Sequence, residues 1–579
     1  MKPLYFLTAA ALMAAACGKT APAPSAAITT PQDLAQHSNE FKREVIKAAD
    51  GVWVAVGYGI ANSILIEGTD GNIVVDTMES MESAHAVALD FEKVSSKPVK
   101  AIIYTHSHPD HIGGAPAFIA PGTTVPIYAQ EDVARNMDKI SSELQPIITK
   151  RALRMYGWGL TPEERVNVGV GGELDLHEGS SIEILRPTKT FRDTLDDTVA
   201  GIHFQLVHAP GETDDHLFVW LPERKVLLSG DNLYRAFPNL YTLRGTSFRD
   251  PKKWAASLDQ MRRLHATVLV PSHTRPLQGE KLIEATLTDY RDAIRYVHDQ
   301  TIRLINAGLL PDEIAERITL PPHLAQSPFL QPFYGKASWS AKNIYAGQLG
   351  WFDGTPEHLN PLPPRQEAEH LQALTGGADK LDQAISRAAQ DKDSQWVLQL
   401  SGAALRLNPN DEVAKNARLA ALLALGQAES NPNARHWYLS AYHELRGDLK
   451  LPDRAITPKP EMLRAMPLST FFDGLAVNLD AAASADTMTT VRFEFSDVSE
   501  NWTYIVRRGV SEVIAPGDTA PDADLVVQVP AQVFKEMLAK LRNPAITMAK
   551  DFEMKKGSKL DLIRFMKLFV PLEANDTRT

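Results

Sequence analysis

Short apolar runs separated by glycine and aspartate turns dominate the chain from about residue 41 to residue 320. The first such stretch, residues 51–77, reads GVWVAVGYGIANSILIEGTDGNIVVDT, and its alternation of apolar and small residues predicts a β-meander. Further strands are predicted within residues 99–104, 203–234 and 266–274. Helices are predicted over residues 252–264 and 283–307. Strands that alternate with helices predict an α/β sandwich with polar clusters at the strand ends.

The pattern changes after about residue 320. Residues 394–429 carry apolar residues at spacings of three and four, broken by Asn-Pro-Asn, which predicts a helical hairpin. From about residue 461 the alternation of strands returns, and helices are predicted over 531–541 and 560–570. We therefore expect three folded parts: an α/β part at 41–320, an all-α part at 321–455 and a small α+β part at 456–579.

The N-terminus has the pattern of an export signal. Lys2 precedes an apolar run from Leu4 to Ala16, and this run ends at Cys17, the only cysteine of the chain. A bacterial lipoprotein signal places its acylated cysteine at such a position, so we expect a signal peptide at 1–17 and a membrane anchor on Cys17. A plain cleaved signal with an incidental cysteine is the alternative. Residues 18–40, rich in alanine, proline, threonine and serine, are expected to form a flexible linker of an exported, periplasmic protein.

Composition narrows the class of partner. The chain has 579 residues and a net charge of −11, without a basic stripe, which argues against binding of nucleic acid. A chain of this length exceeds one hydrophobic core, in agreement with three folded parts. One cysteine allows no disulfide within the chain, so packing alone must hold each part together.

The candidate chemistry is concentrated in residues 105–114, which read THSHPDHIGG and follow a predicted buried strand. In an extended loop, His106 and His108 point to one side, and Asp110 and His111 turn toward a second position beside it. Zinc suits this mixture of imidazole and carboxylate, and a catalytic zinc site keeps one position open. Further ligands must come from distant loops, and three candidates follow predicted strands or their loops, at Glu212, Asp231 and His273.

The HxHxDH motif, followed in order by Glu212, Asp231 and His273, resembles the metallo-β-lactamase fold superfamily of hydrolases. A glutamate at 212, where most of that superfamily has histidine, is similar to the bacterial alkyl sulfatases, as are NLYTLRG (239–245) and the segment 333–364. The resemblance implies an αββα sandwich, then an all-α dimerisation domain and a sterol-carrier-like α+β domain. It also implies a homodimer.

The same resemblance implies a site of two zinc ions. One ion would be held by His106, His108 and Glu212, and the other by Asp110, His111 and His273. Asp231 and a hydroxide would bridge them, although alkyl sulfatases commonly bridge with glutamate. His216, four residues after Glu212, could replace Glu212 or support it through a hydrogen bond.

Arg244, in the TLRG segment, occupies the position that the resemblance gives to a sulfate-binding arginine. Arg249, Tyr156 and Asn232 are weaker candidates for contact with substrate. The resemblance makes Asp110, Asp231 and Arg244 the catalytic residues. Four residues are candidates to line a place for an alkyl chain: Trp158, Phe237, Leu240 and Tyr241.

The sequence therefore predicts zinc-dependent hydrolysis of alkyl sulfate esters by a metal-bound hydroxide, with linear primary alkyl sulfates as the first substrate class. The alternatives are another hydrolase of the same fold, acting on a lactone, a phosphodiester or a β-lactam, and a lipid-binding protein with an inactive hydrolase domain. The residues leave open whether the C–O or the S–O bond breaks.

Overall fold

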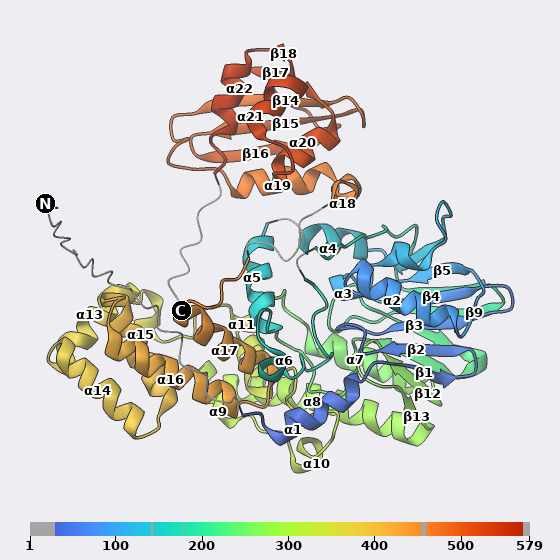
Figure 1. Ribbon diagram of the computed structural model, residues 1–579, viewed down its shortest axis with the longest axis horizontal. Helices are drawn as coiled ribbons and strands as arrows, with labels where there is room; N and C mark the ends of the chain where they lie inside the picture. The colour runs from blue at the N-terminus through green and yellow to red at the C-terminus, as the bar shows by residue number, and fades with distance from the viewer. Residues whose placement is uncertain (1–28, 141–142, 178, 453–458, 571–579) are drawn as a thin grey trace, which may run out of the picture.

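The computed structural model describes residues 29–140, 143–177, 179–452 and 459–570. The expected signal peptide at 1–17, with Cys17, lies outside the described residues. None of the described helices is long and apolar enough to cross a lipid bilayer. Three parts follow one another along the chain, and Figure 1 shows their arrangement.

The first part contains two β-sheets packed face to face. The first sheet has the order β1 to β7, with strands Glu44–Ala49, Val52–Val56, Ser63–Glu67, Asn72–Val75, Val99–Ile103, Ile127–Gln130 and Lys189–Phe191. The second sheet has the order β13 to β8, and its strands β8 to β13 are Thr194–Val199, Ile202–His208, Leu217–Leu221, Val226–Gly230, Val268–Pro271 and Leu277–Gln278. Apolar side chains from both sheets, such as Ile64, Ile103 and Leu228, fill the space between them.

Helices cover the outer face of each sheet. The helix α2 (Met81–Glu92) contributes to the core on the outer face of the first sheet. The helices α7 (Pro251–Arg262) and α8 (Glu280–Asn306) contribute to the core on the second sheet. The other helices described between β1 and α9 are α3 (Pro109–Ile112), η2 (Ala115–Phe118), α4 (Val133–Ile140), α5 (Gln145–Met155), α6 (Pro162–Arg165) and η3 (Pro222–Arg224). The predicted αββα sandwich is confirmed.

The strands β10 and β11 show why such sequences form central strands. The sequence LFVWL of β10 is apolar throughout and buried, and β11 (VLLSG) is buried along its whole length with Ser229 as its one polar residue. A strand covered on both faces needs an apolar side chain at every position instead of every second one. Lys225 adopts a left-handed conformation (φ 48°) in the turn that joins the two strands.

The predicted linker at 18–40 is wrong for its last residues. The helices α1 (Gln32–His37) and η1 (Ser38–Phe41) belong to the folded structure, and Leu34 is fully buried. The composition of residues 18–40 suggested a flexible chain, but Leu34 and Phe41 bury their apolar side chains and help to anchor this segment.

The second part is all-helical, as predicted, but its first helix begins at residue 311, before the predicted start at 321. Its helices α9 to α17 are Pro311–Arg317, Pro322–Ala325, Ala337–Leu349, Pro356–Leu359, Pro364–Thr375, Ala378–Gln390, Ser394–Leu407, Glu412–Ala428 and Pro432–Arg446. The last of them is tied to α5 of the first part. Arg154 and Glu444 form an ion pair of 3.0 Å, and the His436 ring lies 2.8 Å from the carbonyl oxygen of Met155.

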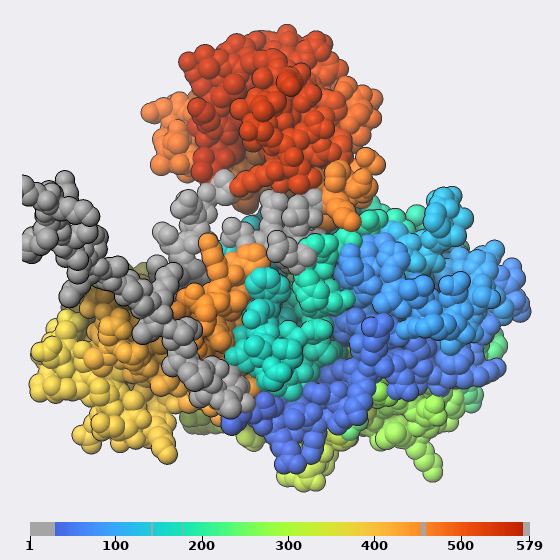
Figure 2. All heavy atoms as spheres, viewed as in Figure 1, coloured from blue at the N-terminus to red at the C-terminus, as the bar shows by residue number. Residues whose placement is uncertain are grey.

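The third part is a five-stranded sheet with helices, and it forms a lobe of its own (Figure 2). Its elements are α18 (Pro460–Ala465), α19 (Leu468–Val477), β14 (Met488–Phe495), β15 (Glu500–Arg507), β16 (Val510–Ile514), β17 (Leu525–Val529), α20 (Ala531–Leu538), α21 (Pro544–Asp551), β18 (Glu553–Lys556) and α22 (Lys559–Met566). Aromatic rings fill its core, and Phe472 stacks on Trp502 with ring centroids 5.0 Å apart.

Candidate active site

The candidate site lies where several strands of both sheets end. The loop after β5 carries His106 and His108, and Pro109 then begins the short helix α3, on which Asp110 and His111 lie. Proline is well suited to the first turn of a helix because its missing N–H has no helical partner there. His106 and His111 are fully buried, so this loop is part of the packed interior and is fixed in place.

The second sheet brings the distant candidates to the same place. Asp231 follows β11 and His273 follows β12, two parallel neighbours whose carboxyl ends lie at one edge of the sheet. Two groups of potential metal ligands result, each with ligand atoms within 4.8 Å of one another: His106, His108 and Asp231, and Asp110, His111 and His273. The structure therefore brings together residues that are up to 167 positions apart in the sequence.

Asp231 lies between the two groups. Its Oδ2 atom is 3.5 Å from His106 Nε2, 3.3 Å from His111 Nε2 and 3.1 Å from His273 Nε2, while Oδ1 is buried without a hydrogen-bond partner. Burial alone would raise the pKa of this carboxyl, but the imidazoles of His111 and His273 outweigh it and hold the pKa well below its usual value. This arrangement fits a carboxylate shared by two cations.

Two of the imidazoles, those of His106 and His108, are neutral in the metal-free protein. His106 Nε2 and His108 Nδ1 face each other at 2.9 Å, and burial lowers the pKa of both rings well below 6.5, which keeps them neutral. A neutral imidazole is the form that binds metals. His111 Nε2 is buried without a hydrogen bond but lies 3.3 Å from Asp231 Oδ2, whereas its Nδ1 lies 2.8 Å from Asp76. The surrounding carboxylates outweigh burial and raise the pKa of His111 well above 6.5, so a metal ion must displace a proton from this ring.

Asp76 is a residue that the sequence analysis missed. It follows β4, and its carboxylate accepts hydrogen bonds from the Thr105 N–H and hydroxyl and from the Ser272 hydroxyl, besides contacting His111. It therefore joins the ends of both sheets and fixes which His111 nitrogen faces the cluster. The Asp-Thr pair directly after a buried strand was the available signal, but it is common at strand ends.

The sequence left open whether Glu212 or His216 is the metal ligand, and the contacts of the two residues differ. Glu212 is buried; its Oε1 pairs with Arg249 Nη1 at 2.9 Å, and its Oε2 has no partner. His216 lies against His106, with ring centroids 4.9 Å apart, and its Nε2 accepts the Asp231 N–H at 2.9 Å. Glu212 thus keeps a carboxylate oxygen free, whereas His216 already holds the backbone of Asp231 and keeps only Nδ1 free.

Two weaker substrate candidates have structural partners instead. The Asn232 amide is fully buried, accepts the Glu212 N–H and donates to the Ala209 carbonyl, so it holds the Glu212 loop in place and does not face a substrate. Arg249 is buried as the ion-pair partner of Glu212. Neither role could be read from sequence, because both depend on the loop between β9 and β10 folding back onto β11.

Arg244 lies beside the cluster of candidate metal ligands. Its Nη2 is 3.1 Å from His108 Nε2, the ring nitrogen that faces away from His106. Arg151 of α5 fixes the Arg244 loop by donating to the carbonyl oxygens of Leu243 and Arg244 at 2.6 and 2.9 Å. The guanidinium is thereby held at the edge of the cluster.

Two tyrosines accompany Arg244. The hydroxyls of Tyr156 and Tyr334 are 3.1 Å apart, and the Arg244 charge acts on both. Burial raises the pKa of both phenols, which keeps them protonated as hydrogen-bond donors. Tyr334 was missed as a site residue because it belongs to the stretch that leads into the helical part, although it lies in the segment 333–364 that carried the family resemblance.

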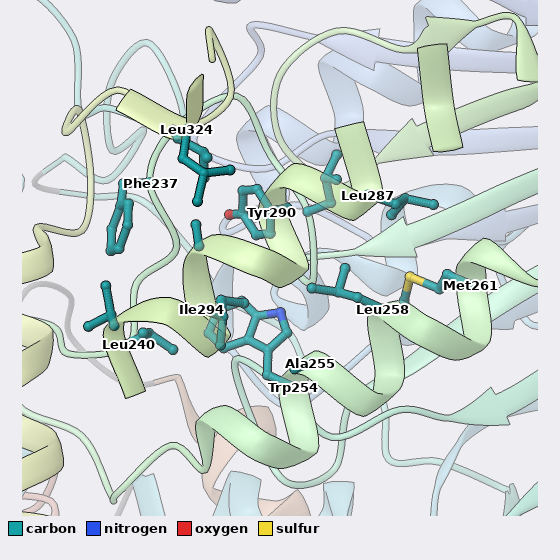
Figure 3. Close-up of a cluster of buried hydrophobic side chains, with 14 of the residues drawn as sticks. Phe237, Leu240, Trp254, Ala255, Leu258, Met261, Leu287, Tyr290, Ile294 and Leu324 are labelled. Atoms are coloured by element: carbon teal, nitrogen blue, oxygen red, sulfur yellow. The ribbon is translucent and has the colours of Figure 1, made fainter. Parts of the chain in front are cut away.

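The apolar candidates for an alkyl-chain site are partly wrong. Phe237 and Leu240 are buried among Trp254, Leu258 and Ile294, in the core that joins α7 and α8 to the second sheet (Figure 3). They are structural residues, because a loop rich in apolar residues packs against the nearest helices as readily as it lines a pocket. Trp158 and Tyr241 are half-buried.

The buried polar atoms test whether the site fits metal ions. Within the described residues, His111 Nε2, Glu212 Oε2 and Asp231 Oδ1 are buried without hydrogen-bond partners; His111 and Asp231 belong to the two ligand groups, whereas Glu212 belongs to neither. Such atoms are rare in folded proteins, because an unpaired buried polar group costs about 1–3 kcal/mol. Imidazole nitrogens and carboxylate oxygens are the ligands that zinc prefers, so the residues fit a bound metal.

A buried carboxyl near this cluster gives a prediction. Burial raises the pKa of Glu79 to about 8, while its Oε1 accepts the N–H groups of Ile60 and Asp175 at 3.0 Å. In the metal-free protein below pH 4.5, Glu79 is protonated in the folded and in the unfolded state. Between pH 4.5 and pH 8 it ionises only in the unfolded state. The contribution of Glu79 to the free energy of unfolding is therefore present below pH 4.5 and is lost as the pH rises to 8.

Glu79→Gln keeps the acceptor oxygen and removes the ionisation. Relative to wild type, its unfolding midpoint is expected to increase between pH 5 and pH 8, by the equivalent of a few kcal/mol. Thermal unfolding of both metal-free proteins across this range measures the difference, with the exposed Glu163→Gln as control. A difference that does not depend on pH would contradict the prediction.

Comparisons with known proteins agree with this architecture. The family model of the metallo-beta-lactamase superfamily matches residues 56–273, that of alkyl sulfatase dimerisation matches 310–448 and that of the alkyl sulfatase C-terminal region matches 457–575. A linear primary-alkylsulfatase of a Pseudomonas species is 41% identical over 79% of this chain and 89% of its own length. A second one is 30% identical over 91% of this chain and 80% of its own.

The solved structures give the same result. The stereoselective inverting sec-alkylsulfatase from a Pseudomonas species superimposes with a TM-score of 0.86 at 25% identity, covering 94% of this chain and 87% of that chain. The likeness extends over all three parts and so is not limited to the αββα sandwich.

Proposed function

Because this chain belongs to the alkyl sulfatase family of the metallo-β-lactamase superfamily and is a sulfuric ester hydrolase, we propose that it hydrolyses linear primary alkyl sulfates at a centre of two zinc ions. The observation that carries the proposal is the position of Arg244, whose Nη2 is 3.1 Å from His108 at the edge of the ligand cluster. A cation held there gives a sulfate head group a fixed partner.

The two zinc ions would be held by seven side chains. His106, His108 and Glu212 would bind one ion, Asp110, His111 and His273 the other, and Asp231 both. When bound, the ions supply Lewis acidity and a water whose pKa is near neutral. His216 would support this set by accepting the Asp231 N–H, and Arg249 by balancing the charge of Glu212.

The sulfate head group would be bound by three side chains of this chain. Arg244 offers a planar fork of N–H donors, which matches a tetrahedral oxyanion. Tyr156 and Tyr334 offer two protonated hydroxyls that now pair with each other and can donate to a sulfate oxygen. Together they would orient the ester beside the metal ligands, as catalysis by positioning requires.

Two further proposals concern assembly and location. Several large apolar side chains of the helical part are exposed, among them Trp351 at 75% and Leu374 at 86%, and they support a homodimer formed through this part. Export with an acylated Cys17 remains a proposal from the sequence alone, and fractionation of cells into membrane and soluble material tests it.

The proposal is tested with purified full-length protein and a panel of substrates. We expect sulfate release from dodecyl sulfate that is lost after removal of metal by a chelator and restored by zinc, with no turnover of the β-lactam nitrocefin. Ion chromatography of the released sulfate and the absorbance of nitrocefin measure the two activities. Hydrolysis of nitrocefin without release of sulfate would instead favour another hydrolase of this fold.

The lipid-binding alternative makes the opposite prediction. Its C-terminal lobe would need room for a lipid, but the described core of this lobe is packed with aromatic rings such as Phe472, Phe493 and Trp502. Lipid that co-purifies with a protein free of sulfatase activity would favour this alternative.

A further inference from the structure

We propose that residues 29–41, here called the N-terminal strap, position the metal ligand His273 through the loop of residues 167–171. The inference rests on the proposed role of His273 at the zinc centre. It goes beyond the ligand set, because it concerns residues more than 230 positions before His273 in the chain.

His273 is oriented by two backbone carbonyls. Its Nδ1 lies 2.8 Å from the Ile60 oxygen and 3.1 Å from the Val170 oxygen, which leaves Nε2 to face Asp231. A hydrogen bond on one ring nitrogen fixes the tautomer and the direction of the other. The position of the loop 167–171 therefore decides how His273 presents its lone pair.

The strap holds this loop by direct hydrogen bonds. His37 Nε2 lies 2.8 Å from the Gly169 oxygen, and Asn167 Nδ2 donates to the Leu34 oxygen and to Ser38 Oγ. Asn167 Oδ1 in turn accepts the Gly169 N–H. The strap therefore binds the Gly169 carbonyl directly through His37 and holds the Gly169 N–H indirectly through Asn167. Gly169 immediately precedes Val170, whose carbonyl orients His273.

Apolar packing reinforces these bonds. Leu34 is fully buried in a cluster that contains Ile60, Val168 and Val170, so it contacts the surroundings of both carbonyls that orient His273. The His37 ring stacks on Phe333 with centroids 4.1 Å apart, next to the substrate candidate Tyr334. Gly169 also approaches the Phe333 oxygen so closely that a Cβ atom would lie 2.1 Å from it.

The strap is itself anchored at its beginning. Arg435 of α17 is fully buried and donates to the Thr29 oxygen and to Thr30 Oγ1, and Ser430 Oγ donates to Asp33. The strap is therefore fixed at one end to the helical part and at the other to the loop next to His273. A segment that only passed over the surface would need neither contact.

The experiment first compares three full-length variants by their affinity for zinc alone. His37→Leu keeps a bulky side chain but removes the donor to Gly169, His37→Gln restores an N–H donor, and Gln36→Ala changes an exposed residue of the same helix. Zinc per chain is measured after dialysis against a series of chelator buffers. We expect one of two zinc ions to bind about 10-fold more weakly in His37→Leu, as for other residues that support a ligand.

The other variants test whether the effect of His37→Leu is specific to the contact with Gly169 and acts through His273. His37→Gln and Gln36→Ala are expected to bind both ions as wild type does. In the double variant His37→Leu/His273→Ala, zinc binding is expected to equal that of His273→Ala alone, because the strap acts through this ligand.

Two outcomes would overturn the inference. Unchanged affinity for both ions in His37→Leu is one, and equal weakening of both ions together with a lower unfolding temperature of the zinc-free protein is the other, since it indicates a general loss of stability. A wild-type protein that takes up no zinc would overturn the proposed function itself, and that result is seen before any variant is compared.

Discussion

Asp231→Asn is expected to lose most of its bound metal and to lower kcat/KM by about a thousandfold or more. Asp231 is the carboxylate that lies within 3.5 Å of the ring nitrogens of His106, His111 and His273, so it contacts members of both ligand groups. Asparagine keeps the size but loses the negative charge. A thousandfold decrease in kcat/KM means that the transition state loses about 4 kcal/mol of stabilisation.

Zinc content per chain and sulfate release from dodecyl sulfate measure the two effects. Glu212→Gln and His216→Gln are informative companions: the first is expected to lose one ion, and the second to keep both with weakened affinity. The reverse result would assign the ligand position to His216. An Asp231→Asn protein with two tightly bound ions and normal turnover would contradict the proposed centre.

Arg244→Ala is expected to keep its zinc and to lose the capacity to bind the sulfate head group. Truncation of one member of a buried charge pair costs roughly 2–5 kcal/mol, which corresponds to a decrease of kcat/KM by a factor of about 30 to 4000. The decrease should appear mainly in KM if Arg244 binds substrate and transition state equally, and in kcat if it acts mainly in the transition state. Steady-state kinetics on dodecyl sulfate separate the two.

Two controls accompany this variant. Arg244→Lys keeps the charge but loses the planar fork, so it is expected to recover only part of the activity. Arg192→Ala removes an arginine that is 79% exposed and paired with Glu131 at 3.6 Å, and it should behave as wild type. If Arg244→Ala retained wild-type efficiency, its assignment as the sulfate partner would be withdrawn.

Much of this fold could be predicted from local patterns. The apolar runs at β5, β10 and β11 are bounded by polar or turn residues, and the helices α7 and α8 fall within a few residues of their predicted ends. The HxHxDH loop could be recognised because four of the metal-ligand candidates lie within six positions of one another. Features whose residues are close in the sequence leave a pattern that a single chain reveals.

Features that depend on contacts between distant residues were missed or misjudged. Asp76 meets His111 and Ser272, Tyr334 meets Tyr156, and Arg249 meets Glu212 only after the sheets and the helical part have packed together. Asn232, a weaker candidate for substrate contact next to Asp231, instead binds the loop before β10 with its side-chain amide. Which side chain faces a ligand depends on tertiary packing.

Arg435 has a consequence for anyone who wishes to dissect or transplant this enzyme. Its guanidinium donates to backbone oxygens of Glu164 and Thr29 as well as to Gly426 of its own part, and Tyr334 crosses the same boundary. An excised sandwich ending near residue 320 would lack a hydroxyl beside Arg244 and would expose the surface that α17 now covers. Designs that graft this enzyme or fuse it to another protein should therefore keep residues 29–452 together as one unit.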